Sequence, residues 1–508
     1  MFSHRLSLGT INFGSIETLE VLKQKAVVIG AGIGGLAMAI RLAVKGFEVS
    51  VLEATSQVGG KNKSFINNGF RFDTGPSLFT MPHLVDELFT LVGKDSSGYF
   101  KYKRLSVSCE YFFEDGTQIT GYSSPKTFAK EIHNKLEVNG RLVQDYLDYS
   151  QNIKRLTGEI FLEKSLHKTK TILSKKALNA ILNLDKLDVF TTMNKANEKR
   201  LKHPKLVQIF NRFATYNGSS PYKAPGILNI ISSLEHGDGV FFPEGGMVNI
   251  SERLFELALE IGVAFYMDEP AKEIITDNGK VCGVKSKFHH YKADLVVSNM
   301  DIFGTYKNLL PKLQKPRKIL NQERSSSALV FYWGINKTFP QLDLHNIFFS
   351  QDYQEEFHYL FDKQQVFSDP TVYVNITAKY SSKDAPQGME NWFVMVNAPN
   401  NKGQNWEQIQ YETKKNIIRK LNRMLGTNLD DCIKSERIWN PVGIEKDTFS
   451  YMGSIYGTSS NSKMSAFFRH PNFSNKINGL YFCGGSVHPG GGIPLALLSA
   501  KIVDSLVP

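Results

Sequence analysis

The chain has 508 residues, 42% of them hydrophobic and 12% aromatic, which is enough for two domains with ample cores. Its net charge is +11, and the excess lies in residues 154–212, which hold 14 Lys or Arg against five Asp or Glu. The four cysteines form no CxxC pair, which excludes a disulfide framework and a zinc site and indicates a reducing, cytoplasmic setting. No uncharged apolar run of about 18 residues is present, so no transmembrane helix is expected. Residues 1–23 are interpreted as an N-terminal extension without a signal-peptide core.

A βαβ unit is predicted near the start of the chain. Residues 25–30 are a β-branched run typical of a buried strand, residues 36–46 repeat apolar side chains at helical spacing, and residues 47–54 form a second strand. The turn between the first strand and the helix fits the pattern Gly-x-Gly-x-x-Gly, in which glycines permit a tight turn and backbone approach to a pyrophosphate at the helix N-terminus. Glu53 follows 18 residues after the last glycine, where its carboxylate can accept ribose hydroxyls. The unit therefore predicts a dinucleotide site, with contacts in the turn from Gly30, Gly32, Ile33, Gly34 and Gly35.

The middle of the chain, residues 124–231, is expected to be helical and contains the basic stretch. Apolar side chains between its lysines would form one side of these helices: Leu166, Ile172, Leu173, Leu178, Ile181, Leu182 and Leu184. A basic, partly amphipathic surface can dock on anionic lipid headgroups, bind nucleic acid or be a solvated helical face. Composition favours the solvated face and membrane docking over nucleic acid.

Further strands are predicted in the second half of the chain. They cover residues 263–268, 272–277, 280–286 and 293–299, and then residues 328–335, 371–378 and 391–397 in a second, antiparallel sheet. Residues 479–485 form a short buried strand that runs into glycines. Pro494 then opens a final helix at a position that tolerates proline.

Three blocks between these elements are typical of flavoproteins of the glutathione-reductase and amine-oxidase type. They are the Gly59-Gly60-Lys61 segment, the block at residues 69–77, and the Pro243–Met247 segment before a helix. Asp73 in the second block is interpreted equally well as a structural hydrogen-bonding residue and as a catalytic one.

The C-terminal block GLYFCGGSVHPGGGIPLALLSAK, residues 479–501, resembles the signature of the carotenoid (phytoene-type) desaturase family of FAD-dependent oxidoreductases. The resemblance is clear over residues 24–90, 232–303 and 436–508. It implies an α/β fold with a discontinuous Rossmann-type FAD-binding domain at residues 24–90, 232–303 and 470–508. It also implies an interleaved α+β substrate domain, with its sheet at residues 91–123 and 304–469 and a helical, basic, membrane-facing part at residues 124–231.

The resemblance also implies further contacts to FAD. These are Ala54, Gly60, Lys61, Gly75, Pro76, Ser77, Ala271, Gly484, Gly485, Gly492, Ile493 and Pro494. Lys61 stands where most such desaturases have arginine, which keeps the charge but loses the fork geometry, and Gly485 stands where many related flavoproteins have an acidic residue. His488 is a candidate proton acceptor, although fixing the glycine-rich turn is the favoured role. No metal site is expected.

The implied reaction removes hydrogen from two adjacent carbons of a C40 carotenoid, as hydride to the flavin plus a proton. An allylic cation beside a polyene is delocalised, so no catalytic acid or base is assigned, and positioning carries the reaction. Residues 75–89 resemble the 1-hydroxycarotenoid 3,4-desaturases most. Phytoene desaturation, carotene isomerisation, amine oxidation and a non-enzymatic basic membrane-binding role stay open as alternatives. The expected partners are a carotenoid from the membrane and the cytoplasmic face of that membrane, to which the protein would attach peripherally, and not nucleic acid; the oligomeric state is open.

Overall fold

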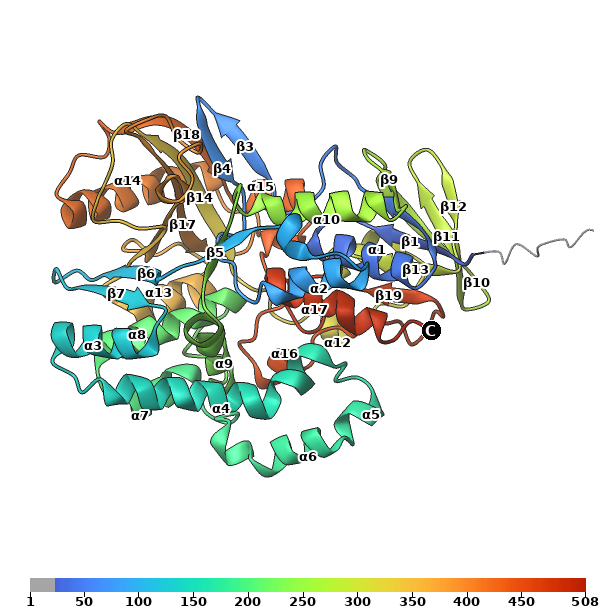
Figure 1. The fold of residues 1–508 in the computed structure, drawn as a ribbon, viewed down its shortest axis with the longest axis horizontal. Coiled ribbons are helices and arrows are strands. Elements are labelled where there is room, and N and C mark those ends of the chain that lie inside the picture. The colour runs from blue at the N-terminus through green and yellow to red at the C-terminus, as the bar shows by residue number, and fades with distance from the viewer. Residues whose placement is uncertain (1–22) are drawn as a thin grey trace, which may run out of the picture.

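The computed structural model describes residues 23–508, so almost all of the predicted N-terminal extension lies outside the described residues. A five-stranded parallel sheet organises one half of the molecule (Figure 1). Its strands, in spatial order, are β19 (Leu480–Phe482), β13 (Leu295–Ser298), β1 (Lys25–Ile29), β2 (Glu48–Leu52) and β9 (Ala264–Tyr266). These short runs are apolar because parallel strands are covered on both faces.

Helices cover one face of this sheet, and a small antiparallel sheet covers the other. The helices are α1 (Ile33–Val44), α2 (His83–Leu91), α10 (Val248–Glu260) and α17 (Ile493–Asp504), which share one hydrophobic core with the sheet. The small sheet consists of β10 (Ala271–Asp277), β11 (Lys280–Ser286) and β12 (His290–Lys292). Helix α1 starts three residues earlier than predicted, because the Gly32 carbonyl already accepts the Leu36 N–H at 2.9 Å and the glycine motif therefore forms the first helical turn.

A seven-stranded sheet forms the other half of the molecule (Figure 1). Its order is β18 (Ile433–Trp439), β14 (Ser327–Ile335), β17 (Glu390–Ala398), β16 (Val372–Ile376), β15 (His345–Phe348), β6 (Val107–Phe112) and β7 (Gln118–Tyr122). The predicted antiparallel pairing of the strands at residues 328–335, 371–378 and 391–397 is confirmed, since β17 pairs antiparallel with both β14 and β16. The neighbours β15 and β6, which were not predicted as a pair, run parallel. Helix α14 (Trp406–Leu425) buries its apolar side against this sheet.

The two halves are joined by a hairpin of β3 (Ser64–Asn67) and β4 (Phe70–Asp73). Phe70 and Phe72 of the hairpin pack with Tyr332 and Phe393 of the seven-stranded sheet. A second short pair, β5 (Tyr102–Arg104) with β8 (Phe241–Pro243), also connects distant segments. The chain thus crosses between the halves several times, and the predicted domain limits stay predictions.

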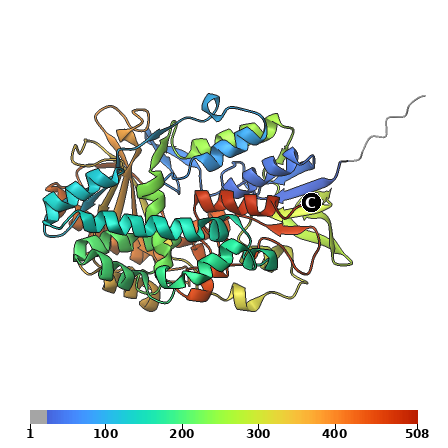
Figure 2. The same ribbon diagram turned by 60° about the horizontal axis from the view of Figure 1, so that its bottom comes forward.

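The middle of the chain forms a layer of helices along one side of both halves (Figures 1 and 2). It contains α3 (Pro125–Leu136), α4 (Arg141–Glu163), α5 (Thr169–Ile172), α6 (Lys175–Leu182), α7 (Met193–Leu201), α8 (Pro204–Asn211) and α9 (Ile230–Ser233). The long helix α4 contacts α17 at one side and α9 at another. Helices α5 and α6 lie outermost, at the bottom of Figure 1.

Candidate active site

A cavity of about 500 Å³ lies where the two large sheets and the helical layer meet. One part of its lining comes from glycine-containing segments near both ends of the chain, at residues 32–34, 59–61 and 484–494. The other part comes from β14, β15, β16 and β17 and from helices α4 and α9, and it is largely apolar. The cavity therefore joins a nucleotide-type glycine cradle to an apolar space.

The first glycine turn presents the N-terminus of α1 to this cavity. Gly32 precedes the helix without a side-chain cap, and no acidic residue stands in the first turn. The backbone N–H groups at the start of a helix have no partner within it, and together with the helix dipole they attract an anion. Gly35 permits the start of α1 to pack closely against the turn after β1, because a Cβ there would lie 2.0 Å from the Gly30 carbonyl oxygen.

The two distant glycine segments meet directly. A Cβ on Gly34 would lie 3.1 Å from the Gly484 Cα, and the Cys483 thiol contacts the Gly34 carbonyl at 3.5 Å. Asn299, just beyond β13, fills the junction and donates from Nδ2 to the Cys483 carbonyl at 3.3 Å. Asn299 also lines the cavity, although it was not predicted as a site residue. Its place at the carboxyl end of a parallel strand is the signal that would have identified it.

Helix α17 presents a second N-terminus to the cavity. Gly492 precedes it with φ +99°, and an added Cβ would meet nothing within 4 Å, so open space lies against the backbone. Because only glycine adopts such a conformation readily and leaves the backbone bare, a flat ring can approach closely here. The positive helix end favours negative charge on that ring.

Most of the predicted FAD contacts line this one cavity: Gly32, Ile33, Gly34, Gly60, Lys61, Gly75, Pro76, Ser77, Gly484, Gly485, Gly492, Ile493 and Pro494. The remaining predicted contacts are not among its lining residues, and they are Gly30, Gly35, Glu53, Ala54 and Ala271. The Glu53 carboxylate accepts the Ala31 N–H at 2.8 Å and the Thr55 N–H at 3.0 Å, which fixes it at the end of β2 beside the glycine turn. A carboxylate has capacity for further donors, so Glu53 and Ala271, at the start of β10, stay predictions for the adenosine half.

Lys61 is a cation in the glycine-lined part of the cavity. Its Nζ donates to the Ile455 carbonyl at 2.9 Å. Burial lowers the pKa of Lys61 to about 8, although Asp301 opposes this and Arg324 reinforces it. Asp301 itself pairs with Arg324 at 3.2 Å. Lys61 is therefore charged at neutral pH but close to losing its proton.

His488 lines the cavity and is buried. Its Nε2 lies 2.9 Å from the Lys164 carbonyl at the end of α4, and burial lowers the pKa of His488 to about 4. The neutral imidazole thus ties the glycine-rich turn to the helical layer. This geometry favours the positioning role over that of proton acceptor.

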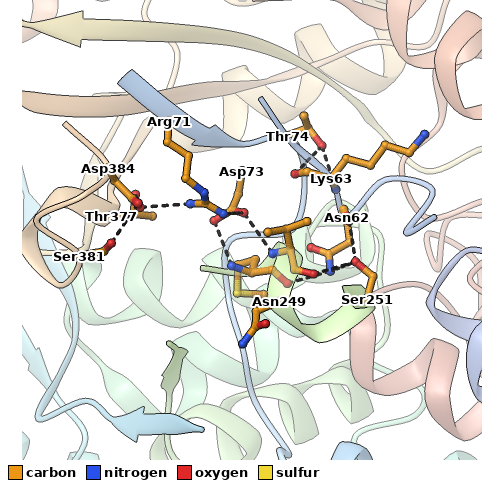
Figure 3. A network of polar contacts seen from close by, with 12 residues as sticks. Asn62, Lys63, Arg71, Asp73, Thr74, Asn249, Ser251, Thr377, Ser381 and Asp384 are labelled. Atoms are coloured by element: carbon orange, nitrogen blue, oxygen red, sulfur yellow. Dashed lines mark hydrogen bonds and ion pairs between the residues drawn. The ribbon is translucent and has the colours of Figure 1, made fainter. Parts of the chain in front are cut away.

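Asp73 does not line the cavity and serves a structural network instead (Figure 3). Its carboxylate accepts the N–H groups of Met247 and Val248 at 3.0 and 3.1 Å, at the start of α10. Arg71 bridges Asp73 at 2.8 Å and Asp384 at 3.1 Å. The 243–247 block therefore connects α10 to the hairpin and to the second sheet.

A group of polar side chains lies at the cavity near the seven-stranded sheet, with Arg212 and Tyr216 in the cavity lining, and no local sequence pattern predicted it. Arg212 pairs with Glu235 at 3.1 Å and donates to Tyr216 at 2.5 Å, and the Tyr216 hydroxyl donates to Glu235 at 2.6 Å. Burial alone would raise the pKa of Glu235, but Arg212 and its other neighbours hold it below the usual value. Arg212 had been counted in the basic stretch, yet it is buried in the interior.

His345 stands beside this group and also lines the cavity. Its Nδ1 lies 2.7 Å from the Tyr373 hydroxyl, which donates to Ser77 at 2.8 Å. Burial lowers the pKa of His345 to about 4, so the imidazole is neutral at pH 7. No local pattern marks His345 or Arg212 in the sequence, because their partners are distant in the chain.

The residues present fit FAD. Two uncapped helix N-termini without acidic first turns converge on the cavity and match a diphosphate and an electron-rich ring edge. Gly492 leaves bare backbone with open space beside it, which suits the flat ring system. FAD would be held by the 30–35 turn, by Lys61 and by the 484–494 segment.

Comparisons with known proteins identify the family and the fold of the chain. Flavin-containing amine oxidoreductases match residues 33–503 as a family. Two solved structures share the fold over 95% of this chain. An oxidoreductase from Methanosarcina mazei has TM-score 0.62 at 15% identity with 100% of its own chain covered, and cyclohexylamine oxidase from Brevibacterium oxydans has TM-score 0.60 at 14% with 98% covered.

Relatives of known name are closer in sequence. A 1-hydroxycarotenoid 3,4-desaturase from Flavobacterium sp. is 50% identical over 96% of this chain and 99% of its own. A 4,4'-diapolycopene oxygenase from Methylomonas sp. is 34% identical over 95% of this chain and 98% of its own, and a 4,4'-diaponeurosporene oxygenase from Staphylococcus aureus is 35% identical over 94% and 96%. The chain therefore belongs to the flavin-containing amine oxidoreductases and, within them, to the carotenoid desaturase family of FAD-dependent oxidoreductases.

Proposed function

We propose that this enzyme introduces the 3,4 double bond into a 1-hydroxycarotenoid. The observation that carries the proposal is the cavity itself, because an apolar space lined by the seven-stranded sheet and by α4 and α9 opens directly from the FAD cradle. Apolar walls suit a polyene and disfavour a charged amine. The desaturase relative at 50% identity over nearly the whole chain supports the choice of reaction.

The reaction removes two hydrogens from adjacent carbons. When bound, FAD supplies the two-electron acceptor for the hydride, and the neighbouring carbon loses a proton as the double bond forms. The chain contributes position, since Phe393, Met395 and the α9 side chains enclose the polyene and exclude water. The α17 N-terminus would contribute positive charge at the flavin ring where electron density accumulates, and Lys61 would hold the diphosphate.

The test is anaerobic incubation of the FAD-loaded enzyme with carotenoids in liposomes, following flavin bleaching and product absorbance. A 1-hydroxycarotenoid should bleach the flavin and gain one conjugated double bond per FAD reduced. Conversion of phytoene instead would assign the enzyme to the alternative desaturation. A change of double-bond geometry without flavin bleaching would assign it to isomerisation.

We also propose that helices α5 and α6 dock on an anionic membrane surface. Apolar side chains on these helices are unusually exposed, with Leu173 at 82% and Leu182 at 73%, and we call Ile172, Leu173, Leu178, Ile181 and Leu182 the α5–α6 patch. Exposed lysines flank it, including Lys168, Lys170 and Lys175. Leu166, expected on the same side, is buried instead and lines the cavity. Apolar side chains beside lysines suit a lipid interface better than nucleic acid.

The α5–α6 patch follows α4, whose Phe161 and Leu162 line the cavity, so docking would place the lipid close to the apolar part of the site. No helix within residues 23–508 combines the length and apolarity needed to cross a bilayer. Peripheral attachment at the cytoplasmic face is the location we propose, and the four unpaired cysteines suit that compartment.

Liposome co-sedimentation tests the docking. Leu173→Ser with Leu182→Ser should weaken binding to vesicles containing anionic lipid by about tenfold, because two large apolar groups no longer enter the interface. Ile66→Ser is the matched control, since Ile66 is 75% exposed on β3, on the opposite side of the molecule from α6 (Figure 1). Equal binding by the patch variant and the control would exclude the patch as the docking surface.

A further inference from the structure

His345 is a buried polar residue whose hydrogen bonds are incomplete. Its side chain lines the cavity while the residue is only 3% exposed, and its Nε2 has no hydrogen-bond partner. Its Nδ1 is held by the Tyr373 hydroxyl at 2.7 Å, and the two rings stack. A buried nitrogen without a partner is destabilising, and at the wall of a cavity a bound ligand can supply the missing group.

The charges around His345 indicate whether the ligand group at this position is charged or neutral. Arg212 and Tyr216 line the same polar part of the cavity, but the Arg212 charge is already balanced by Glu235. With a neutral imidazole beside a balanced ion pair, the subsite carries no net charge to attract a carboxylate or an amine. It suits a neutral oxygen group at the end of an otherwise apolar molecule.

The position of His345 matches the chemistry of the proposed reaction. The Tyr373 hydroxyl touches both His345 Nδ1 and Ser77 Oγ, so one oxygen separates His345 from the 75–77 segment predicted to lie near the flavin. In a 1-hydroxycarotenoid the carbon that bears the hydroxyl is two bonds from carbon 3. A residue that hydrogen-bonds this hydroxyl must therefore lie close to the flavin and not at a remote end of the cavity.

We propose that His345 is a specificity-determining residue that hydrogen-bonds the end-group hydroxyl of the polyene through Nε2. The inference rests on the proposed function, and it names His345 as the residue that distinguishes a substrate with a hydroxylated end from one with a hydrocarbon end. Because the Tyr373 hydroxyl donates its hydrogen to Ser77, it accepts from Nδ1, so Nε2 of the neutral imidazole is an acceptor to which the end-group hydroxyl can donate. A hydrocarbon end leaves Nε2 unpaired, and a site built to bond a hydroxyl rejects the analogue that lacks it.

The test compares two substrates of equal chain length, a 1-hydroxycarotenoid and the same polyene without the hydroxyl. Wild type, His345→Leu, His345→Phe and His345→Gln are loaded with FAD and assayed for kcat/KM, and Kd is measured by quenching of tryptophan fluorescence, since Trp439 lines the cavity. The Leu and Phe variants should lower kcat/KM and raise Kd for the hydroxylated polyene about tenfold. The hydrocarbon polyene should be bound as well as before. Gln, which keeps a polar group, should restore part of the preference.

His236→Leu is the matched control. His236 is also buried, stacks on Phe128 at 5.1 Å and has two unpartnered ring nitrogens, but it does not line the cavity. Its replacement should affect both polyenes alike. Flavin retention shows whether each variant is folded. If His345→Leu loses its flavin, the comparison is made with His345→Phe, which keeps a ring stacked on Tyr373.

Two failures are distinguishable. Equal Kd values of wild type for the two polyenes, or equal losses for both in the apolar His345 variants, would overturn the assignment of His345 while leaving desaturation intact. Failure of the wild-type enzyme to bind or convert either polyene would overturn the proposed function itself.

Discussion

Lys61 shows how a single substitution relative to a family pattern changes the chemistry available to a site. Lysine is a point charge whose pKa responds to burial, whereas arginine stays protonated at any physiological pH. In the cavity, burial brings the pKa of Lys61 to about 8. The negative charge of Asp301 raises this pKa but does not restore it, and the positive charge of Arg324 lowers it further. The positive charge near FAD is therefore conditional on pH.

Lys61 gives the site a pH dependence that arginine would remove. Below pH 8 the ammonium is charged and attracts the anionic cofactor, and above pH 8 the unliganded protein loses this charge, so the Kd for FAD should rise from pH 7 to pH 9 by up to about tenfold. Lys61→Arg should bind FAD equally at both pH values, and Lys61→Met should bind about tenfold more weakly at pH 7. Titration of the apoprotein by flavin fluorescence measures all three. Unchanged affinity of Lys61→Met at pH 7 would exclude a charge contact to FAD.

At the scale of elements, the hairpin β3–β4 holds the start of α10 and the second sheet together. Arg71 lies between Asp73 and Asp384, and both carboxylates are buried (Figure 3). Asp384 is held further by the hydroxyls of Thr377 and Ser381. A Cβ on Gly246 would lie 2.6 Å from the Arg71 guanidinium, so the glycine before α10 makes room for this network.

Removal of Arg71 should be costly for stability. Arg71→Met leaves two buried carboxylates without their cation, which destabilises the fold by about 3–5 kcal/mol and lowers the thermal midpoint by several degrees. Arg423→Met is the control, because Arg423 pairs with Glu114 at 2.7 Å on the surface, where an ion pair contributes about 0–1 kcal/mol. Thermal unfolding followed by circular dichroism gives both midpoints. Similar shifts of the thermal midpoint in the two variants would contradict a stabilising role of the network around Arg71.

At the scale of the whole molecule, one cavity brings together segments separated by more than 400 positions. The Gly34–Gly484 contact, with Asn299 between the segments, makes the site depend on three distant parts of the chain. A ligand that touches all of them stabilises the folded chain by mass action, about 2.7 kcal/mol at a concentration one hundred times its Kd.

FAD should therefore raise the thermal midpoint of the apoprotein in a concentration-dependent way. FMN, which lacks the adenosine half, should raise it less, because it cannot reach Glu53 and Ala271. Thermal scans with each nucleotide at matched concentrations test the prediction. Equal stabilisation by FMN would contradict the adenosine contacts that are predicted at the end of β2 and the start of β10.

The parts of the fold that the sequence predicted are those specified by local patterns. The glycine turn, α1 and β2 are contiguous, and glycine spacing and apolar periodicity suffice to identify them. The strands β14, β16 and β17 were likewise visible as β-branched and aromatic runs. The β15–β6 pair was not, because β15 is a short run that includes His345 and Asn346 and its partner lies far away in sequence.

Side-chain clusters formed by tertiary folding could not be predicted in this way. Arg212, Glu235 and His345 come from different elements, and Arg212 was counted among surface charges because charge along the sequence carries no information on burial. The apolar residues of the basic stretch show the same limit, since Leu166 is buried and Leu173 is exposed although each stands within three residues of a lysine.

The meeting of the 30–35 turn with the 484–494 segment also has a consequence for biogenesis. A growing polypeptide lacks its cofactor pocket until β19 and the start of α17 have been synthesised, so flavin can fill the site only after both segments have folded against the 30–35 turn. Until then the apolar walls of the cavity lack the side that residues 484–494 provide. Flavin binding therefore belongs to the last stage of folding, when the two segments have met, and not to the folding of the first βαβ unit.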